Sequence, residues 1–262
     1  MSERAVRLEI GDGIGRITLC QPARGNPFDQ RFCAELCEAA IDCDENPAVR
    51  AVLIRAEGKY FSVGADLKWL GRERELLPRH LKAATADLHM AVSRLARADA
   101  PVVIAVHALA TGGSVSLTAM ADFAIAARSA SFYAAFNAIG FVSDSGGTWY
   151  LPRRVGSRKA ADFVMLNEHW TAEQALGHGL LSRVVNDADL EAEAESLARK
   201  LADGPTRTYG EMKRLFLSSS EQPLEAQLEL EARAIARCAR TEDSWAAIQS
   251  VLAREKPGFR GQ

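Results

Sequence analysis

The stretch Thr111-Gly112-Gly113-Ser114 joins an apolar run, residues 102–106, to a second apolar segment of helical character, residues 115–122. A strand that passes through two glycines into a helix leaves backbone N–H groups without an acceptor in the same segment. Such groups can bind an anion, or the negative oxygen that forms when a thioester becomes an enolate. An ordinary strand-to-helix connection has the same sequence, so the rest of the chain decides between the two interpretations.

Length and composition are those of an ordinary globular protein. The chain has 262 residues, of which 25% are charged and 48% hydrophobic, enough for one large domain or a core with a helical annex. The formal net charge of -2 argues against a nucleic-acid partner or an anionic membrane surface. The sequence shows neither a secretory signal nor a run of about 18 apolar residues, so we expect a cytoplasmic protein.

Cysteine usage favours reduced thiols over a metal site. The five cysteines are Cys20, Cys33, Cys37, Cys43 and Cys238, and none stand in a C-x-x-C pair. Cys33 and Cys37 share one helix face, but a zinc site would need two further ligands that the neighbouring sequence does not offer. We therefore expect no metal.

Apolar runs of strand length alternate with helical patterns up to about Val155. The runs that predict strands are residues 6–10 and 14–20, which form a hairpin around Gly11-Asp12-Gly13, and residues 51–56, 102–106 and 123–126. The helical patterns cover about residues 28–44, 72–98 (interrupted near Pro78) and 115–120. This alternation indicates an α/β core with right-handed crossover connections.

The first helix has a start signal and a defined apolar face. Asn26 is the expected N-cap, with Pro27 at the first helical position. The residues predicted to face the core are Phe32, Leu36, Ala40 and Ile41.

Beyond about Val155 helical patterns dominate. They cover residues 158–166, 172–177, 189–202, 205–218 and 223–254, with a short strand at residues 181–185. The last segment has an apolar stripe formed by Leu224, Leu228, Ala232 and Ile235. The stripe could face another subunit, but we expect it to pack on the core.

Eight motifs, taken in order, resemble the crotonase family, also called the enoyl-CoA hydratase/isomerase superfamily. They are Phe61-Ser62-Val63-Gly64-Ala65-Asp66-Leu67-Lys68, the run from Pro101 to Gly113, Ala130-Ser131-Phe132, Ile139-Gly140-Phe141-Val142, Gly146-Gly147-Thr148, Leu151-Pro152-Arg153, Ala172-Glu173-Gln174-Ala175 and Gly179-Leu180. The resemblance covers nearly the whole chain. It implies an α/β spiral of ββα units over residues 1–200 with the acyl-CoA site. Residues 201–262 would form a helical part that oligomerises and covers the active site, in a homotrimer or a hexamer made of two trimers.

The same resemblance implies a coenzyme A thioester whose carbonyl oxygen lies between the N–H groups of Ala65 and Gly113. Gly113 would also stand at a helix N-terminus, whose partial positive charge favours a negative oxygen. Coenzyme A is then part of the substrate, and no separate cofactor is implied.

The nucleotide and pantetheine of coenzyme A are expected to follow one part of the surface. The resemblance implies that the backbone near Arg24 and along Ala65, Asp66 and Leu67 holds them. Lys68 could contact a phosphate, although a solvated helix lysine would look the same.

Two positions depart from the hydratases of the family. The hydratase pattern after the strand ends in a catalytic glutamate, and Ser116 occupies that position. The second hydratase glutamate is replaced by Phe136. Addition of water uses one group to activate the water and another to handle the α-proton, and neither side chain does this well.

One carboxylate remains in this region, that of Asp144. The surrounding sequence resembles the branch that isomerises ring-epoxide and unsaturated acyl-CoAs in phenylacetate catabolism, which implies that Asp144 is the catalytic residue. Phe136, Phe141, Val142 and Trp149 would make its environment apolar and raise its basicity. By position alone, Asp144 could instead be the N-cap of a following helix.

The leading hypothesis is therefore an isomerase that shifts a double bond or isomerises a ring epoxide, with Asp144 as acid and base. An enoyl-CoA hydratase is the main alternative. A 4-chlorobenzoyl-CoA-type dehalogenase, with Asp144 as nucleophile and His89 as base, and a non-catalytic acyl-CoA-binding protein are further alternatives. The acyl group is left open, because its pocket walls are expected from the variable residues 69–88.

Overall fold

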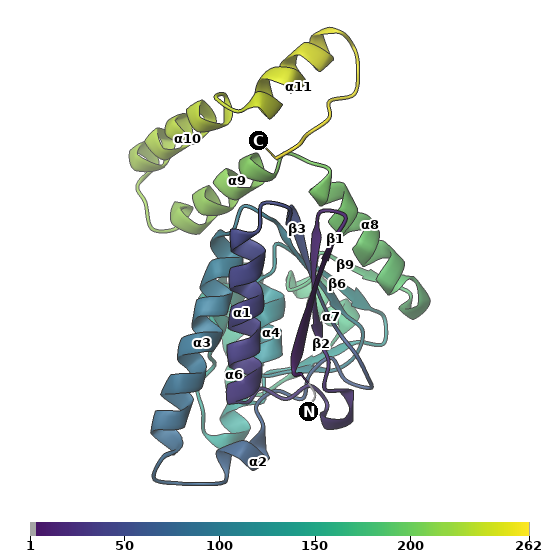
Figure 1. Cartoon of the computed structure of the whole chain (residues 1–262). Coiled ribbons are helices and arrows are strands. Elements are labelled where there is room, and N and C mark those ends of the chain that lie inside the picture. Colours follow the sequence, from purple (N-terminus) through teal and green to yellow (C-terminus); the bar gives the residue numbers. More distant parts are fainter. Residues whose placement is uncertain (1–3, 262) are drawn as a thin grey trace.

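Two β-sheets organise the chain in the computed structural model, which describes residues 4–261 (Figure 1). Within these residues, the larger sheet has six strands in the order β1-β2-β3-β4-β6-β9, and the smaller has three in the order β5-β7-β8. The larger sheet contains β1 (Val6–Gly11), β2 (Ile14–Leu19), β3 (Ala51–Ala56), β4 (Val102–Val106), β6 (Phe123–Ala127) and β9 (Arg183–Val185). The smaller contains β5 (Ala110–Thr111), β7 (Ser131–Tyr133) and β8 (His169–Thr171).

The predicted hairpin is confirmed at one edge of the larger sheet. β1 and β2 pair antiparallel from Val6 opposite Leu19 to Gly11 opposite Ile14. The turn between them passes through Asp12 and Gly13, both with positive φ (54° and 78°), which matches the twist of the flanking strands. From β2 onward, β3, β4, β6 and β9 each pair parallel with the preceding strand in the sheet.

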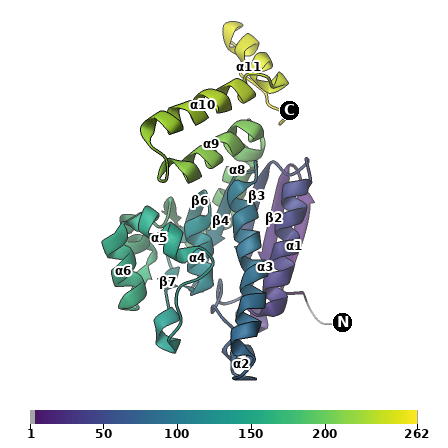
Figure 2. The same cartoon turned by 90° about the vertical axis from the view of Figure 1, so that its left-hand side faces the viewer.

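Helices connect these strands and, after β9, make up most of the rest of the chain. They are α1 (Gln30–Glu45), α2 (Leu67–Leu70), α3 (Leu77–Arg97), α4 (Gly113–Met120), α5 (Gly147–Val155), α6 (Ser157–Met165), α7 (Ala172–His178), α8 (Leu190–Ala202), α9 (Thr206–Ser219), α10 (Leu224–Cys238) and α11 (Glu242–Leu252). Short 3-10 helices are η1 (Pro22–Arg24), η2 (Phe136–Ile139) and η3 (Asp187–Asp189). α1 and α3 run side by side and α8 covers β2, β3, β4 and β6 (Figures 1 and 2).

The central strands are covered on both faces. All five residues of β4 are buried, as are the first four of β3. Continuous apolar runs such as these are expected for parallel strands between helical layers. The predicted α/β alternation is therefore observed, and it leaves the loops that follow β3 and β4 at one end of the sheet.

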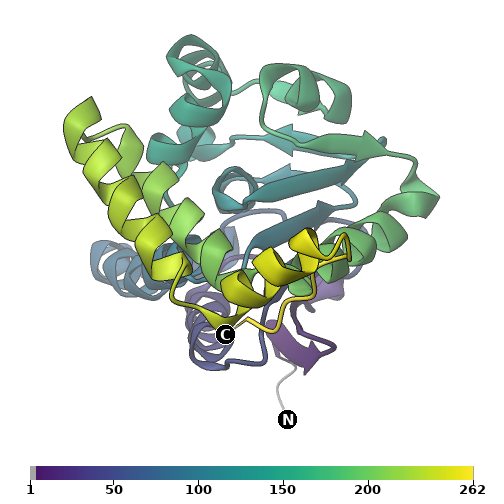
Figure 3. The same cartoon turned by 90° about the horizontal axis from the view of Figure 1, so that it is seen from above.

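The last two helices do not pack on the sheet. α10 packs on α9, and α10 and α11 project from one end of the molecule (Figures 1 and 2), the end that faces the viewer in Figure 3. The expected core packing of the apolar stripe is wrong, because Leu224, Leu228, Ala232 and Ile235 are all exposed. The predicted helix over residues 223–254 is also two helices, since Thr241 caps α11 by accepting a hydrogen bond from Ser244 N at 3.1 Å.

The predicted start of the first helix is wrong by three residues. Asp29 is the N-cap of α1 and accepts from Phe32 N at 2.9 Å. Asn26 is buried instead, where its side chain accepts from Gln21 N and donates to the carbonyls of the segment 57–61. This side chain ties two loops together, which a local helix signal does not reveal.

Smaller differences from the sequence predictions concern the buried face of α1 and the first residues of α3 and β9. Ile41 is at the exposed edge of α1, whereas Phe32, Leu36 and Ala40 are buried as predicted. The segment expected to be helical over residues 72–98 begins at Leu77, with Pro78 in the first turn of α3, a position that needs no N–H. The strand expected over residues 181–185 begins at Arg183.

In residues 4–261, none of the helices combines the length and apolar character needed to span a bilayer.

Candidate active site

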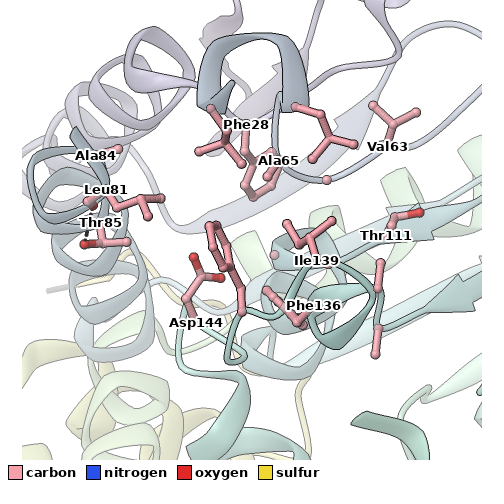
Figure 4. A pocket seen from close by; sticks show the side chains of 18 of the residues that line it. Phe28, Val63, Ala65, Leu81, Ala84, Thr85, Thr111, Phe136, Ile139 and Asp144 are labelled. Carbon is pink, nitrogen blue, oxygen red and sulfur yellow. Dashed lines mark hydrogen bonds between the residues drawn. The ribbon is translucent and has the colours of Figure 1, made fainter. Parts of the chain in front are cut away.

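A cavity of about 330 Å³ lies where the loops after β3 and β4 meet α3 (Figure 4). Its apolar walls come from α1, α3, the segment that leads to α5 and two glycine turns. The first glycine turn is Gly64-Ala65, after β3, and the second is Gly112-Gly113, after β4. The walls include Phe28, Cys33, Ala65, Leu67, Leu81, Ala84, Leu88, Gly113, Phe136, Ile139 and Phe141. Among the described residues that line the cavity, Asp144 provides the only carboxylate.

The first glycine turn presents the Ala65 N–H to the cavity. Phe28 N donates to Gly64 O at 2.8 Å, and Asp66 N donates to Phe28 O at 2.9 Å. Because these bonds flank Ala65 in a parallel bridge, the Ala65 N–H points away from Phe28. No acceptor for it is found among residues 4–261.

The second glycine turn presents the Gly113 N–H. Gly112 has φ 59° and ψ -124°, a conformation open essentially to glycine alone, and its N–H donates to Tyr133 O at 2.9 Å. Gly113 is the first residue of α4, so its own N–H has no acceptor within the helix. In the described part of the chain, no other acceptor bonds to it.

The two turns are in contact. A Cβ atom built on Gly112 would lie 3.7 Å from Gly64 Cα, and one built on Gly64 would lie 3.0 Å from Thr111 O. The structure therefore brings Ala65 and Gly113, which the sequence motifs paired, to the same cavity. Two N–H groups at such a place can bind one oxygen and stabilise negative charge on it.

Asp144 stands on the opposite wall, on the loop between η2 and α5. Figure 4 shows Asp144 and Phe136 facing Phe28 and Ala65 across the cavity. Ser145 Oγ donates to Asp144 Oδ1 at 3.0 Å. Burial raises the pKa of Asp144 above its ordinary value, while the Ser145 hydrogen bond and the nearby His89 oppose the rise. Asp144 does not cap α5, because Gly146 is the N-cap and no side chain bonds there.

His89 reaches the same loop from α3. Its Nε2 atom accepts a hydrogen bond from Ser145 N at 3.2 Å. Ser145 is fully buried and has φ 54°, a left-handed conformation that is uncommon for residues other than glycine. His89 itself does not line the cavity in the described structure.

The two positions that the resemblance matched to hydratase glutamates do not supply carboxylates here. Ser116 is fully buried and does not line the cavity, and its hydroxyl has no partner among the described residues. It lies instead against Gly147, 2.4 Å from where a Cβ atom would be. Phe136 lines the cavity as an apolar wall.

The residues expected along coenzyme A occupy the rim near the first turn. Arg24 donates to Asp29 Oδ2 at 3.0 Å and also pairs with Asp66. Asp66 caps α2 by accepting from the N–H groups of residues 68 and 69. Leu67 lines the cavity and Lys68 is exposed on α2. The charge of Arg24 is thus offset by two carboxylates, whereas Lys68 is exposed and forms no ion pair with the described residues.

Three residues at the site were not predicted from the sequence. Phe28 was assigned only to a helix start, yet its backbone flanks Ala65 and its ring contacts Gly113. Ser145 bonds both Asp144 and His89. Cys33 lines the cavity, and burial followed by the nearby Asp144 charge raises the pKa of its thiol. Of the four residues predicted to make the surroundings of Asp144 apolar, Phe136, Phe141 and Val142 line the cavity. The prediction is wrong for Trp149, which does not line it and instead stacks on Arg153, 3.8 Å from the ring centre.

Comparisons with known proteins agree along the full chain. The family described as Enoyl-CoA hydratase/isomerase matches residues 9–262. The 1,2-epoxyphenylacetyl-CoA isomerase of Escherichia coli (strain K12) is 34% identical over 97% of both chains. A "probable enoyl-CoA hydratase" of Rhodobacter capsulatus is 34% identical over 100% of both. The crystal structure of an enoyl-CoA hydratase from Polaromonas sp. JS666 has a TM-score of 0.91 at 26% identity, covering 97% of this chain and 99% of that one.

Proposed function

The chain belongs to the enoyl-CoA hydratase/isomerase family, and we propose that within it the protein is an acyl-CoA isomerase. It would shift a double bond in a coenzyme A thioester, or isomerise a ring epoxide, through an enolate. One observation supports this most directly: the open N–H groups of Ala65 and Gly113 share a cavity with Asp144, the one carboxylate among its described lining residues. Isomerisation needs one such group, because the same carboxylate takes a proton from one carbon and returns it to another.

For the double-bond shift, the steps follow from this arrangement. The thioester carbonyl oxygen accepts hydrogen bonds from the N–H groups of Ala65 and Gly113. Asp144 removes a proton from the α- or γ-carbon, and the electron pair moves onto the carbonyl oxygen to form the enolate. The two N–H groups and the positive end of α4 stabilise that charge. The protonated Asp144 then donates to the other carbon, so the product has the formula of the substrate.

Hydration is less well supported by these residues. It requires a second group that activates water, and the buried Ser116 and the apolar Phe136 occupy the corresponding positions. Dehalogenation would need His89 as a base. The His89 Nε2 atom already accepts from Ser145 N, and His89 is not among the described residues of the cavity wall.

The binding of coenzyme A is proposed along the rim that Asp66, Leu67 and Lys68 form. Leu67 would contact the pantetheine, since it is exposed and lines the cavity. Lys68 would contact a phosphate, because it is the next residue of α2 and is exposed. Coenzyme A would enter as part of the substrate, with no additional cofactor in the reaction.

A homotrimer, or a hexamer of two trimers, is the proposed assembly. Large apolar side chains are exposed along the arm formed by α10 and α11. They include Leu224, Leu228, Ile235, Trp245, Ile248, Val251 and Leu252. Large apolar side chains exposed on two successive helices are typical of an interface, and contact with other copies would remove them from water.

The decisive experiment is hydrogen exchange in deuterated water with a panel of enoyl- and arylacetyl-CoA thioesters. We expect the wild-type protein to introduce deuterium at the α- or γ-carbon, and Asp144→Asn to lose this while still binding the thioester in calorimetry. Full exchange by Asp144→Asn would contradict the assignment of the base. Binding without exchange across the panel would indicate a binding protein, and incorporation of labelled water oxygen would indicate a hydratase.

A further inference from the structure

We propose that Ser145 and His89 are positioning residues, which together hold the Asp144 carboxylate toward the enolate site. The proposal rests on the proposed function, because it assigns these residues a role only through Asp144. Neither residue would contact the reacting carbon atoms.

The Ser145 hydroxyl lies between the two halves of the site. It donates a hydrogen bond to Asp144 Oδ1 at 3.0 Å. The Ser145 Oγ atom also lies 3.2 Å from where a Cβ atom on Gly113 would be. Ser145 is fully buried, so water does not compete for this hydrogen bond. The hydroxyl thus fixes one carboxylate oxygen of Asp144 and leaves the other for the substrate.

The backbone of Ser145 places that hydroxyl, and His89 holds the backbone. Ser145 has φ 54° and is followed by Gly146 at φ 79°, so the loop passes through two successive left-handed residues. For serine this conformation costs energy and persists only where surrounding contacts enforce it. The hydrogen bond from Ser145 N to His89 Nε2, at 3.2 Å, is such a contact, and its acceptor belongs to the 21-residue helix α3.

The same residues balance the two protonation states of Asp144. Burial favours the neutral acid, and the Ser145 donor favours the carboxylate. The groups that face Asp144 are His89 from α3, Cys33 from α1 and Ser145 from its own loop. A group that must both take and return a proton works best when neither state is strongly preferred.

The first test compares Ser145→Ala with Ser143→Ala. Both serines are buried on one loop, but the Ser143 hydroxyl has no partner among the described residues. Ser145→Ala removes a hydrogen-bond donor to the Asp144 carboxylate, so the pKa of Asp144 should rise. We expect the acidic limb of the plot of kcat/KM against pH to move to higher pH by about one unit. The substitution should also lower kcat more than tenfold with KM nearly unchanged. Ser143→Ala should reproduce the wild-type profile.

The second test compares two replacements of His89. His89→Gln retains an acceptor that can reach Ser145 N, whereas His89→Leu does not. We expect the glutamine variant to keep most of the wild-type kcat, and the leucine variant to lose at least tenfold, with matched circular dichroism confirming that both fold.

Two results would overturn the proposal: a Ser145→Ala profile that superimposes on the wild type, or equal kcat values for His89→Gln and His89→Leu. Asp144→Asn in the same deuterium assay separates this outcome from failure of the proposed function. If Asp144→Asn abolishes exchange while Ser145→Ala leaves the profile unmoved, the isomerase assignment stands and the positioning role falls. If Asp144→Asn still exchanges, the isomerase assignment itself fails.

Discussion

The ring of Phe28 packs on the Cα atom of Gly113, so that a methyl group added there would lie 2.9 Å from Phe28 Cε2. The backbone of the same phenylalanine flanks Ala65 with two hydrogen bonds. Phe28 therefore sets the positions of both open N–H groups before any substrate binds. Donors that are fixed in advance stabilise developing charge without reorganising during the reaction.

Gly113→Ala should disrupt this arrangement. The new methyl group would press on the Phe28 ring and would lie 3.2 Å from Ser145 Oγ, so the Gly113 N–H would move. We expect kcat/KM to fall by about 10²–10³, the usual effect of losing one such donor. Steady-state kinetics with an exchanging thioester would measure it.

Gly177→Ala is the matched control, because a Cβ atom there meets nothing within 4 Å and the residue lies inside α7. It should leave kcat/KM unchanged and raise stability slightly, since alanine is the better helix former. Wild-type activity in Gly113→Ala would show that this N–H is not part of the oxyanion site.

Asp144→Asn should stabilise the protein while it inactivates it. Burial raises the pKa of Asp144, so the native state binds this proton more tightly than the unfolded state does. Its contribution to stability is then present below the ordinary aspartate pKa and is lost as pH rises through the raised value. At pH 7 the variant should melt at a higher temperature than the wild type, by about 2–4 °C for each kcal/mol of stability regained.

This gain should disappear at a pH below the ordinary aspartate pKa, where both proteins have a neutral side chain at residue 144. Calorimetric melting across that pH range measures it. An equal difference at all pH values would contradict a raised pKa for Asp144. In the wild type, kcat/KM should also fall as pH drops through the raised pKa, because the base form is lost.

The fold was predictable because its signals are local. The apolar runs of β3 and β4 and the order of the motifs predicted the α/β crotonase spiral, which the match to the family and the superposition confirm. Ala65 and Gly113 could be paired from motifs alone. The roles of Asn26, Phe28 and Ser145 depend on contacts between segments far apart in the chain, for which periodicity contains no information.

The position of the last two helices was not predictable for a related reason. An apolar stripe on a helix indicates that this face is buried, but it does not indicate whether the face packs on the same chain or on another. The stripe of α10 was therefore assigned to the core, whereas it is exposed in this chain.

Ser116→Ala should have little effect on activity. The Ser116 hydroxyl is buried without a partner among the described residues and lies outside the cavity wall. Removing a buried hydroxyl that makes no hydrogen bond should change stability by about 0–1 kcal/mol, toward a more stable protein. A loss of activity beyond tenfold in the deuterium assay would instead favour hydration through a water that this serine holds.

Lys68→Ala should weaken coenzyme A binding more than Arg24→Ala does. Arg24 is already paired with Asp29 and Asp66, whereas the Lys68 ammonium is exposed on the adjacent helix. We expect Lys68→Ala to raise KM several-fold with kcat unchanged, the pattern of lost uniform binding. Comparison with a dephospho-coenzyme A thioester shows whether the 3′-phosphate is the partner.

Lys59→Ala is the control for that comparison, because its ammonium lies over the Tyr60 ring at 5.3 Å. If Lys59→Ala and Lys68→Ala raise KM equally, the effect is one of general charge and not of a specific contact.

A charge placed on the exposed apolar face of the α10–α11 arm should dissociate the assembly. Leu228 is 53% exposed on α10 and Ile248 is 51% exposed on α11, so burial of the exposed half of each side chain at an interface is worth about half of the ~1.5–3 kcal/mol that full burial gives. An aspartate at either position would have to be buried unpaired, which costs more than the lost contact. Light scattering should therefore report a trimer or hexamer for the wild type and a smaller species for Leu228→Asp and Ile248→Asp. Met165→Asp, at an exposed apolar residue on α6, should retain the wild-type mass, and a monomeric wild type would contradict the proposed assembly outright.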